Sequence, residues 1–236
     1  MADTTDVAPE RVLAVYAHPD DPEVSCGGTL AHWAGVGAEV HVVICASGDK
    51  GTVDPATDPA ELVKRRAVEM DAAAAVLGLA GHHRLDHSDG DLEEATDLRA
   101  QLVGLVRTVR PDTVVCPDPT AVFFGQRYFN HRDHRAVGWA ALDAVAPAAW
   151  SPLYFPRSGP PHRVDTVYLS GTLQPDTWVD ISGTIEAKVE ALLCHVSQVD
   201  GPPDSVRTVV RQRAAEGGRP AGLRYAEAFR VLRFAG

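Results

Sequence analysis

The chain has 236 residues, of which 45% are hydrophobic and 23% charged, and its formal net charge is −10 at pH 7. This composition is typical of a globular protein with a full hydrophobic core, folded as one large domain or two small ones. The acidic balance argues against a surface for nucleic acids or anionic membranes, because such surfaces gather lysine and arginine. We therefore expect a small molecule as the partner.

The first part of the chain alternates short apolar runs with longer amphipathic segments, as parallel strands joined by crossover helices do. Near-continuous apolar runs at residues 11–17 and 39–46 predict strands covered on both faces. The stretch "GGTLAHWAGVGA" between them has apolar residues at helical spacing. One right-handed βαβ unit is therefore expected over residues 11–46.

The same alternation continues along the rest of the chain. The expected elements are a helix at 58–79, a strand at 82–86, a helix at 96–111 ended by Pro111, a strand at 112–118, a helix starting near Asn130 after an aromatic loop, strands at 163–170 and 177–182, and a helix at 185–199. We expect the polar segment 200–222 to be partly mobile. The order predicts one α/β domain over residues 1–236, with a Rossmann-like, mostly parallel sheet flanked by helices on both faces.

The cysteines are four in number and far apart, with no CxxC pair. They are expected to be reduced, mostly buried thiols, Cys26 among them. No basic segment followed by an apolar one begins the chain, and no run of 18 apolar residues occurs. We expect a cytoplasmic protein that does not enter the membrane.

Histidines and carboxylates gather in two clusters after expected strands. The first cluster is His18 with Asp20, Asp21 and Glu23, and the second is His131 with Asp133 and His134. Ligands of open α/β sheets bind beyond the carboxyl ends of the strands, so the two clusters can meet in space. They are expected at the ends of the first and fourth predicted strands.

Catalytic zinc sites use three His, Asp or Glu ligands and keep one position open for water. His18 and Asp21 could supply two ligands, and one histidine of "HRDH" the third. Asp20 and the remaining histidine would then stand where a general base and an electrostatic stabiliser are needed. Each cluster alone has a plainer interpretation: a helix-capping turn with solvated carboxylates, or two surface histidines at a helix start.

The stretches "AHPDDPE", "GGTLA" and "NHRDHR" resemble the paired signatures of the PIG-L/LmbE family of zinc-dependent deacetylases. Members of that family remove the acetyl group from N-acetylglucosaminyl compounds, thiol-conjugated sugars, glycolipid precursors and antibiotic intermediates. The stretches "ASGDKG", "RRAVEMDAAAAVLG", "SDGDL", "VRPDTVV" and "KVEALLCHVSQ" also occur in the expected order. The resemblance therefore runs through most of the chain.

The resemblance implies a role for each residue of the two clusters. It implies that His18, Asp21 and His134 are metal ligands, which would hold one Zn²⁺ per chain. Asp20 would be the general base and His131 the stabiliser of the oxyanion. Asp133 would orient one of these histidines by accepting its ring N–H.

The resemblance also implies substrate contacts, with Arg66 and Asp89 placed where relatives hold sugar hydroxyls. Arg66 could instead belong to a solvated, salt-bridged helix face. Two departures stand out: Pro22 separates "HPDD" from Glu23, and Phe129 stands where some relatives have tyrosine. If a phenol assists the oxyanion here, Tyr128 must supply it.

The expected activity is zinc-dependent hydrolysis of an N-acetyl group from an N-acetylglucosamine-type amino sugar or sugar-containing metabolite. Two alternatives remain at this point. One is an amidase for a longer acyl group or a non-sugar amide such as a thiol conjugate, and the other is a catalytically silent metal-binding module. Because members of the family are often oligomeric, we also expect a homo-oligomer.

Overall fold

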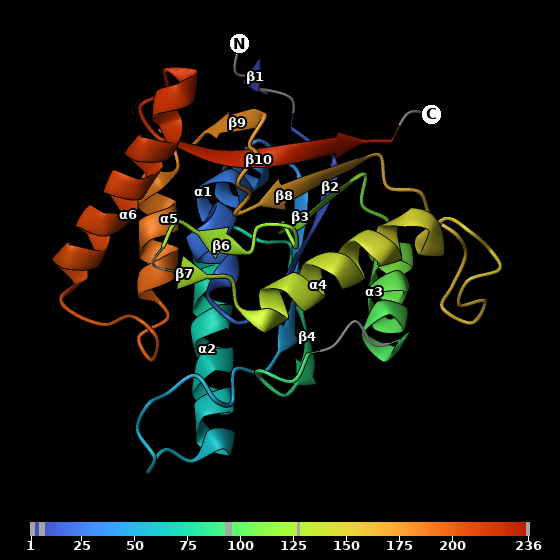
Figure 1. The fold of residues 1–236 in the computed structure, drawn as a ribbon, viewed down its shortest axis with the longest axis horizontal. Helices are drawn as coiled ribbons and strands as arrows, with labels where there is room; N and C mark the ends of the chain where they lie inside the picture. Colours follow the sequence, from blue (N-terminus) through green and yellow to red (C-terminus); the bar gives the residue numbers. More distant parts are fainter. Residues whose placement is uncertain (1–2, 5–7, 93–95, 127, 235–236) are drawn as a thin grey trace.

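The computed structural model describes residues 3–4, 8–92, 96–126 and 128–234. The strands are β1 (Asp3–Thr4), β2 (Arg11–Tyr16), β3 (Glu39–Ala46), β4 (Gly81–His87), β5 (Thr113–Pro117), β6 (Phe123–Phe124), β7 (Tyr128–Phe129), β8 (Thr166–Ser170), β9 (Thr177–Asp180) and β10 (Ala226–Arg233). Eight of them form one sheet in the order β1-β9-β10-β8-β5-β2-β3-β4 (Figure 1). Only β10 runs antiparallel to its neighbours, so the predicted mostly parallel sheet is confirmed.

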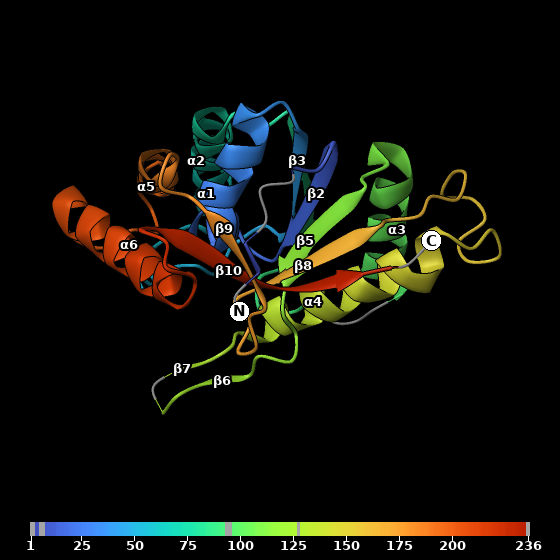
Figure 2. The ribbon, with the colours of Figure 1, turned by 90° about the horizontal axis from the view of Figure 1, so that it is seen from above.

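Helices cover both faces of the sheet, as expected (Figure 2). They are α1 (Asp21–Gly35), α2 (Pro59–Leu77), α3 (Thr96–Val109), α4 (Arg132–Asp143), α5 (Ile185–Leu193) and α6 (Pro203–Gly218), with a π-helical turn at Ala144–Ala149 and a 3₁₀ turn at Arg219–Ala221. One face carries α1, α2, α5 and α6, and the other carries α3 and α4. No helix in the described ranges is long and apolar enough to span a bilayer.

The alternation of side chains along β2 builds the two cores. Leu13 and Val15 pack in the core beneath α3 and α4, whereas Val12, Ala14 and Tyr16 pack in the core beneath α1, α5 and α6. All five side chains are at most 2% exposed. A strand buried on both faces needs such a continuous apolar run, which explains why residues 11–17 were readable as a central strand.

The helix predicted after Asp58 also forms where its signals place it. The Asp58 carboxylate accepts a hydrogen bond from Ala60 N (2.9 Å), and Pro59 occupies the first helical position. Gly78 ends the helix in the left-handed conformation (φ 71°), which costs glycine little. Local sequence therefore determines both ends of α2.

The expectation of a partly mobile segment at 200–222 is wrong, because most of it is the ordered helix α6. Val210 and Ala214 repeat at helical spacing and are 7% and 5% exposed against α5 and β10. On the outer face Arg211 pairs with Glu186 of α5 (2.7 Å). The high charge that suggested mobility is the solvated face of an amphipathic helix.

The aromatic loop before α4 contains a small antiparallel hairpin of β6 and β7 that the sequence did not predict. Figure 2 shows this hairpin extending away from the main sheet. Its Phe123 and Phe129 are 70% and 64% exposed. The hairpin runs directly into the second histidine cluster and so carries that cluster's first residues into place.

Candidate functional site

The first cluster lies on the tight turn that joins β2 to α1. Asp21 N donates to His18 O (3.2 Å), and His18 N donates to Asp21 Oδ2 (2.8 Å), which closes the turn. Asp20 has φ 110° in this turn, a conformation that residues other than glycine rarely adopt and that active sites often contain. The turn follows the central strand β2, beside β5, as the carboxyl-end rule requires.

The second cluster lies at the start of α4, one connection after β5. The expected cap was Asn130, but the helix is capped by His131, whose Nδ1 accepts from Asp133 N (3.2 Å). Asn130 instead places Oδ1 3.0 Å from His134 Nδ1, while its amide nitrogen donates to Ala121 O (3.0 Å). The Asn130 side chain thus contacts His134 and the preceding loop instead of capping the helix.

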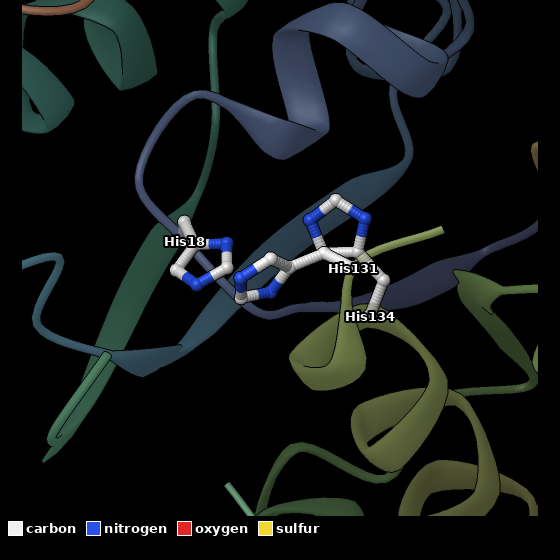
Figure 3. Close-up of side chains that lie close together, drawn as sticks. All are labelled: His18, His131 and His134. Atoms are coloured by element: carbon white, nitrogen blue, oxygen red, sulfur yellow. The ribbon is translucent and has the colours of Figure 1, made fainter. Parts of the chain in front are cut away.

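The two clusters meet, as Figure 3 shows for the three histidines. The ring centroid of His18 lies 5.0 Å from that of His131 and 5.4 Å from that of His134. The Asp21 carboxylate lies between two of these rings, with Oδ2 3.4 Å from His18 Nδ1 and Oδ1 3.1 Å from His134 Nε2. The residues expected as metal ligands therefore converge on one point.

The opposite edge of the His18 ring faces two further carboxylates. His18 Nε2 lies 3.0 Å from Asp89 Oδ1 and 3.3 Å from Asp133 Oδ2. Asp133 is completely buried, and its Oδ2 also accepts from Gly90 N (2.7 Å). The histidine that Asp133 orients is thus His18, and this contact fixes which edge of the ring turns toward Asp21 and His134.

These contacts shift the pKa values of the two histidines. Burial opposes charge on the His18 ring, but its hydrogen bonds, first that to Asp133, raise the pKa of His18 to about 12. Burial also opposes charge on His134, and the Asp21 carboxylate outweighs it and raises that pKa too. The pKa of His131 moves the other way, because burial and the nearby His18 cation lower it.

Arg66 holds the strained Asp20 in position. The guanidinium is 2% exposed, and its Nη2 donates to Pro19 O (2.6 Å) and to Asp20 Oδ1 (3.0 Å). A solvated helix face for Arg66 is therefore excluded. Burial, then the Asp21 charge, raise the pKa of Asp20 to about 7, and Arg66 opposes that rise.

Two residues without an assigned role also build the site. Asp49, in the stretch "ASGDKG", accepts hydrogen bonds from Asp89 N (2.8 Å) and Ser88 Oγ (3.3 Å) and so holds the turn that carries Asp89. Gly48 lies against the Arg66 guanidinium, where a Cβ atom would collide with it. The sequence signal for both was this polar, glycine-containing stretch directly after a predicted strand.

Other expected residues lie outside the cluster. Tyr128 is 53% exposed on the hairpin and packs against Phe124, with ring centroids 5.6 Å apart. Glu23 turns away from the three histidines, since its Oε2 lies 3.3 Å from Nε2 of the fully buried His195. Cys26 is fully buried and contacts the Tyr16 hydroxyl (3.0 Å), as expected of a structural thiol.

The described residues hold two groups of donor atoms close enough for a metal ion: His18 with His131 and His134, and His18 with Asp89 and Asp133. A partly buried His and carboxylate cluster at the carboxyl ends of parallel strands is the donor set of metal-dependent hydrolases. The fold and site therefore define the class of an α/β enzyme with a candidate metal centre.

Comparison with known proteins identifies the family. The PIG-L family, described as GlcNAc-PI de-N-acetylase, matches residues 13–145, and the chain belongs to it. The chain is 33% identical to diacetylchitobiose deacetylase of Thermococcus kodakarensis, over 94% of this chain and 83% of that protein. It is 31% identical to the 1D-myo-inositol 2-acetamido-2-deoxy-alpha-D-glucopyranoside deacetylase of Mycolicibacterium smegmatis, over 82% of each.

A solved structure agrees with these relatives. The N,N'-diacetylchitobiose deacetylase of Pyrococcus horikoshii, complexed with an inhibitor, superposes with a TM-score of 0.87 at 29% identity. The match covers 95% of this chain and 84% of that one. The expected family and the expected enzyme class, a deacetylase, are confirmed.

Proposed function

We propose that this protein hydrolyses the N-acetyl group of an N-acetylglucosamine-type amino sugar, with one zinc ion held by His18, Asp21 and His134. The relatives named above act, by their names, on acetylated amino sugars, which supports the substrate class. One sheet joins β1 and β10, near the two ends of the chain, which supports a single deacetylase domain over residues 1–236.

The main support for the metal assignment is that both ring nitrogens of His18, and both of His134, lie beside hydrogen-bond acceptors. His18 lies between Asp21 on one edge and Asp89 with Asp133 on the other. His134 lies between Asn130 Oδ1 and Asp21 Oδ1. Each ring must then carry two protons, or offer one lone pair to a cation beside the Asp21 carboxylate. A divalent cation replaces both protons, so this donor set fits zinc.

The contacts favour a metal on the side of His18 that faces Asp21 and the two other histidines, and not on the side that faces Asp89 and Asp133. The Nε2 edge of His18 is held by Asp89 and by Asp133, whose Oδ2 already accepts from Gly90 N. That edge acts as a hydrogen-bond donor to carboxylates, the usual arrangement behind a metal-binding histidine. The ring's Nδ1 lone pair is then the one directed toward the metal.

When bound, zinc would polarise the acetamide carbonyl and lower the pKa of water at the site. Asp20, with one oxygen held by Arg66, takes the proton from the attacking water. His131 accepts a hydrogen bond at Nδ1, so its neutral ring carries a proton on Nε2 and can donate a hydrogen bond to the developing oxyanion. The amide C–N bond then breaks, and the amine leaves with the proton that Asp20 took from the attacking water.

The substrate contacts stay predictions. Asp89 has one oxygen toward His18 and a side chain that is 14% exposed, which suits a hydroxyl acceptor at the edge of the site. Tyr128 stands three residues before His131, on the hairpin. Arg66 has both terminal nitrogens already occupied by Pro19 O, Gly48 O and Asp20.

The test is release of amine from a panel of N-acetylated amino sugars, using chelator-treated protein with and without added zinc. Release that requires zinc and is confined to this sugar class is the expected result. A second readout follows from the donor set: zinc binding should release about two protons per chain near neutral pH, measurable by calorimetry in buffers of different ionisation heat. Zinc binding without any amine release would contradict the proposed activity.

A further inference from the structure

A cavity of ≈ 710 Å³ lies between α1, α5, α6, β10 and the β6–β7 hairpin. Its size is within the range of small-molecule sites, about 300–1,000 Å³. Its apolar wall includes Val24, Phe124, Leu192, Val210 and Ala214. None of these side chains has a part in the chemistry proposed above.

The cavity shares two segments with the catalytic site. Val24 and Ser25, which line it, stand three and four residues after Asp21 on α1, and Val24 N donates to Asp20 O (3.0 Å). Tyr128 lines it from the hairpin that leads to His131. Along α1 the cavity therefore begins about one helical turn, roughly 5.4 Å, from Asp21, one of the proposed metal ligands.

Two of the three charged residues on the cavity wall, Lys188 and Glu227, are paired, and the third, Arg213, is exposed. Lys188 and Glu227, 6% exposed each, form an ion pair with each other. The Glu227 carboxylate also accepts from Gly28 N (3.1 Å) and Thr29 N (2.7 Å), and Lys188 Nζ donates to Val24 O (2.9 Å). These groups pair internally and tie α1, α5 and β10 together, which leaves the wall, lined also by Arg213, mainly apolar.

At the cavity, hydrophobic surface is left open to water. Val24 is 48% exposed on α1, a helix that is otherwise mostly buried, and Tyr128 is 53% exposed on the protruding hairpin. Exposed apolar surface around a concave site is the usual mark of a place that a ligand covers. A ligand with an alkyl or aryl group would remove this surface from water.

We propose that the cavity binds an apolar alkyl or aryl group attached to the anomeric oxygen of the N-acetylated amino sugar. This inference rests on the proposed function, in which the acyl group is acetyl and the variable part of the substrate is the aglycone. The protein would then prefer hydrophobic glycosides to the free sugar or to a methyl glycoside.

The experiment compares zinc-loaded protein on the methyl and hexyl β-glycosides of N-acetylglucosamine. Each buried methylene contributes about fourfold to binding, so kcat/KM for the hexyl glycoside should be at least about tenfold higher. Equal kcat/KM for the two glycosides would overturn the inference and leave the proposed function standing. If neither glycoside is deacetylated, the proposed function itself fails.

Two substitutions on α6 test whether the cavity causes the preference for the hexyl glycoside. Ala214→Trp fills the cavity and should bring the hexyl-to-methyl ratio of kcat/KM close to 1. Val209→Trp is the matched control, because Val209 is 45% exposed on the same helix and does not line the cavity. The control should keep the wild-type ratio, and a ratio unchanged in Ala214→Trp would contradict the location.

Two measurements on the wild-type protein keep the proposal testable if Ala214→Trp does not fold. Hexyl β-glucoside, which has no amide, should inhibit at least about tenfold more strongly than methyl β-glucoside. N-hexanoylglucosamine should be a poorer substrate than N-acetylglucosamine. A preference for the hexanoyl amide would assign the cavity to the acyl chain and overturn the aglycone assignment.

Discussion

Two buried arginines lie on opposite sides of the sheet, and they differ in the groups to which they donate hydrogen bonds. Arg107 of α3 and Arg66 of α2 are each 2% exposed. Arg107 donates only to backbone carbonyls: those of Ala148, Ala149, Ser151, Tyr154, Phe155 and Gly159, at 2.7–3.2 Å. Arg66 divides its hydrogen bonds between two carbonyls and the Asp20 carboxylate.

The difference separates a structural role from a functional one. Arg107 uses all three of its nitrogens and fixes the irregular segment 148–159 on the surface. Buried polar atoms without hydrogen bonds occur on both sides among the described residues: Arg66 Nε, Glu23 Oε2 and Asp133 Oδ1 in or near the site, and Arg99 Nε on the helix of Arg107. The distinguishing feature is the partner, because Arg66 donates to the Asp20 carboxylate whereas Arg107 donates to backbone carbonyls alone. The comparison therefore predicts that substitutions in the proposed site, at Arg66 and Asp20, lower activity, whereas substitution of Arg107 lowers the stability of the fold.

The largest effect is expected from Asp20→Asn, which keeps the left-handed turn and the acceptor for Arg66 but removes the base. General acid–base groups contribute about 10²- to 10⁴-fold, so kcat should fall by that amount. Zinc content, measured by elemental analysis, should stay at the wild-type level. Near-normal turnover with zinc bound would rule out Asp20 as the base.

The next effect is expected from His131→Asn. Asparagine is a favoured helix cap, so the start of α4 should be preserved while the Nε2–H donor is lost. Removal of an oxyanion donor costs about 10²- to 10³-fold in kcat. Thermal unfolding provides the control: an unchanged midpoint with reduced kcat supports the role, and unchanged kcat contradicts it.

In contrast to these two site variants, Arg107→Met should lower the stability of the fold. It leaves six carbonyls without their charged donor, and hydrogen bonds of this kind contribute about 1.5–3 kcal/mol each before rearrangement and rehydration. We expect the free energy of unfolding in urea to fall by about 3 kcal/mol, with kcat per folded molecule unchanged. Arg110→Met, just beyond the end of the same helix and exposed, is the matched control. A loss of kcat in Arg107→Met without a loss of stability would contradict the structural role of Arg107.

Arg66→Met should have the smallest effect and the most informative pattern. If Arg66 positions Asp20, kcat falls about tenfold while KM stays constant; if it binds the sugar, KM rises. Because Arg66 lowers the pKa of Asp20, its loss raises that pKa. The base must be ionised to act, so the rise of kcat with pH should move to higher pH. The exposed neighbour Arg65→Met should show neither change.

Much of the fold could be predicted because its signals are local. The apolar run of β2 and the Asp58, Pro59 and Gly78 signals of α2 act within a few residues of each element. The helix α6 was missed because its polar majority outweighed a narrow apolar stripe, and only packing against α5 and β10 makes that stripe visible. The β6–β7 hairpin was missed because its two strands have two residues each.

The sequence by itself determined the donor types and their order: "HPDD" after one buried strand and "NHRDH" after another. That those strands are neighbours, so that Asp21 lies between His18 and His134, was decided by the sheet. So was the partner of each group: Asp133 on His18, Arg66 on Asp20, and Asp49 behind Asp89. Motif spacing reports which atoms are available, whereas contacts between residues 40 to 115 positions apart depend on how the chain packs.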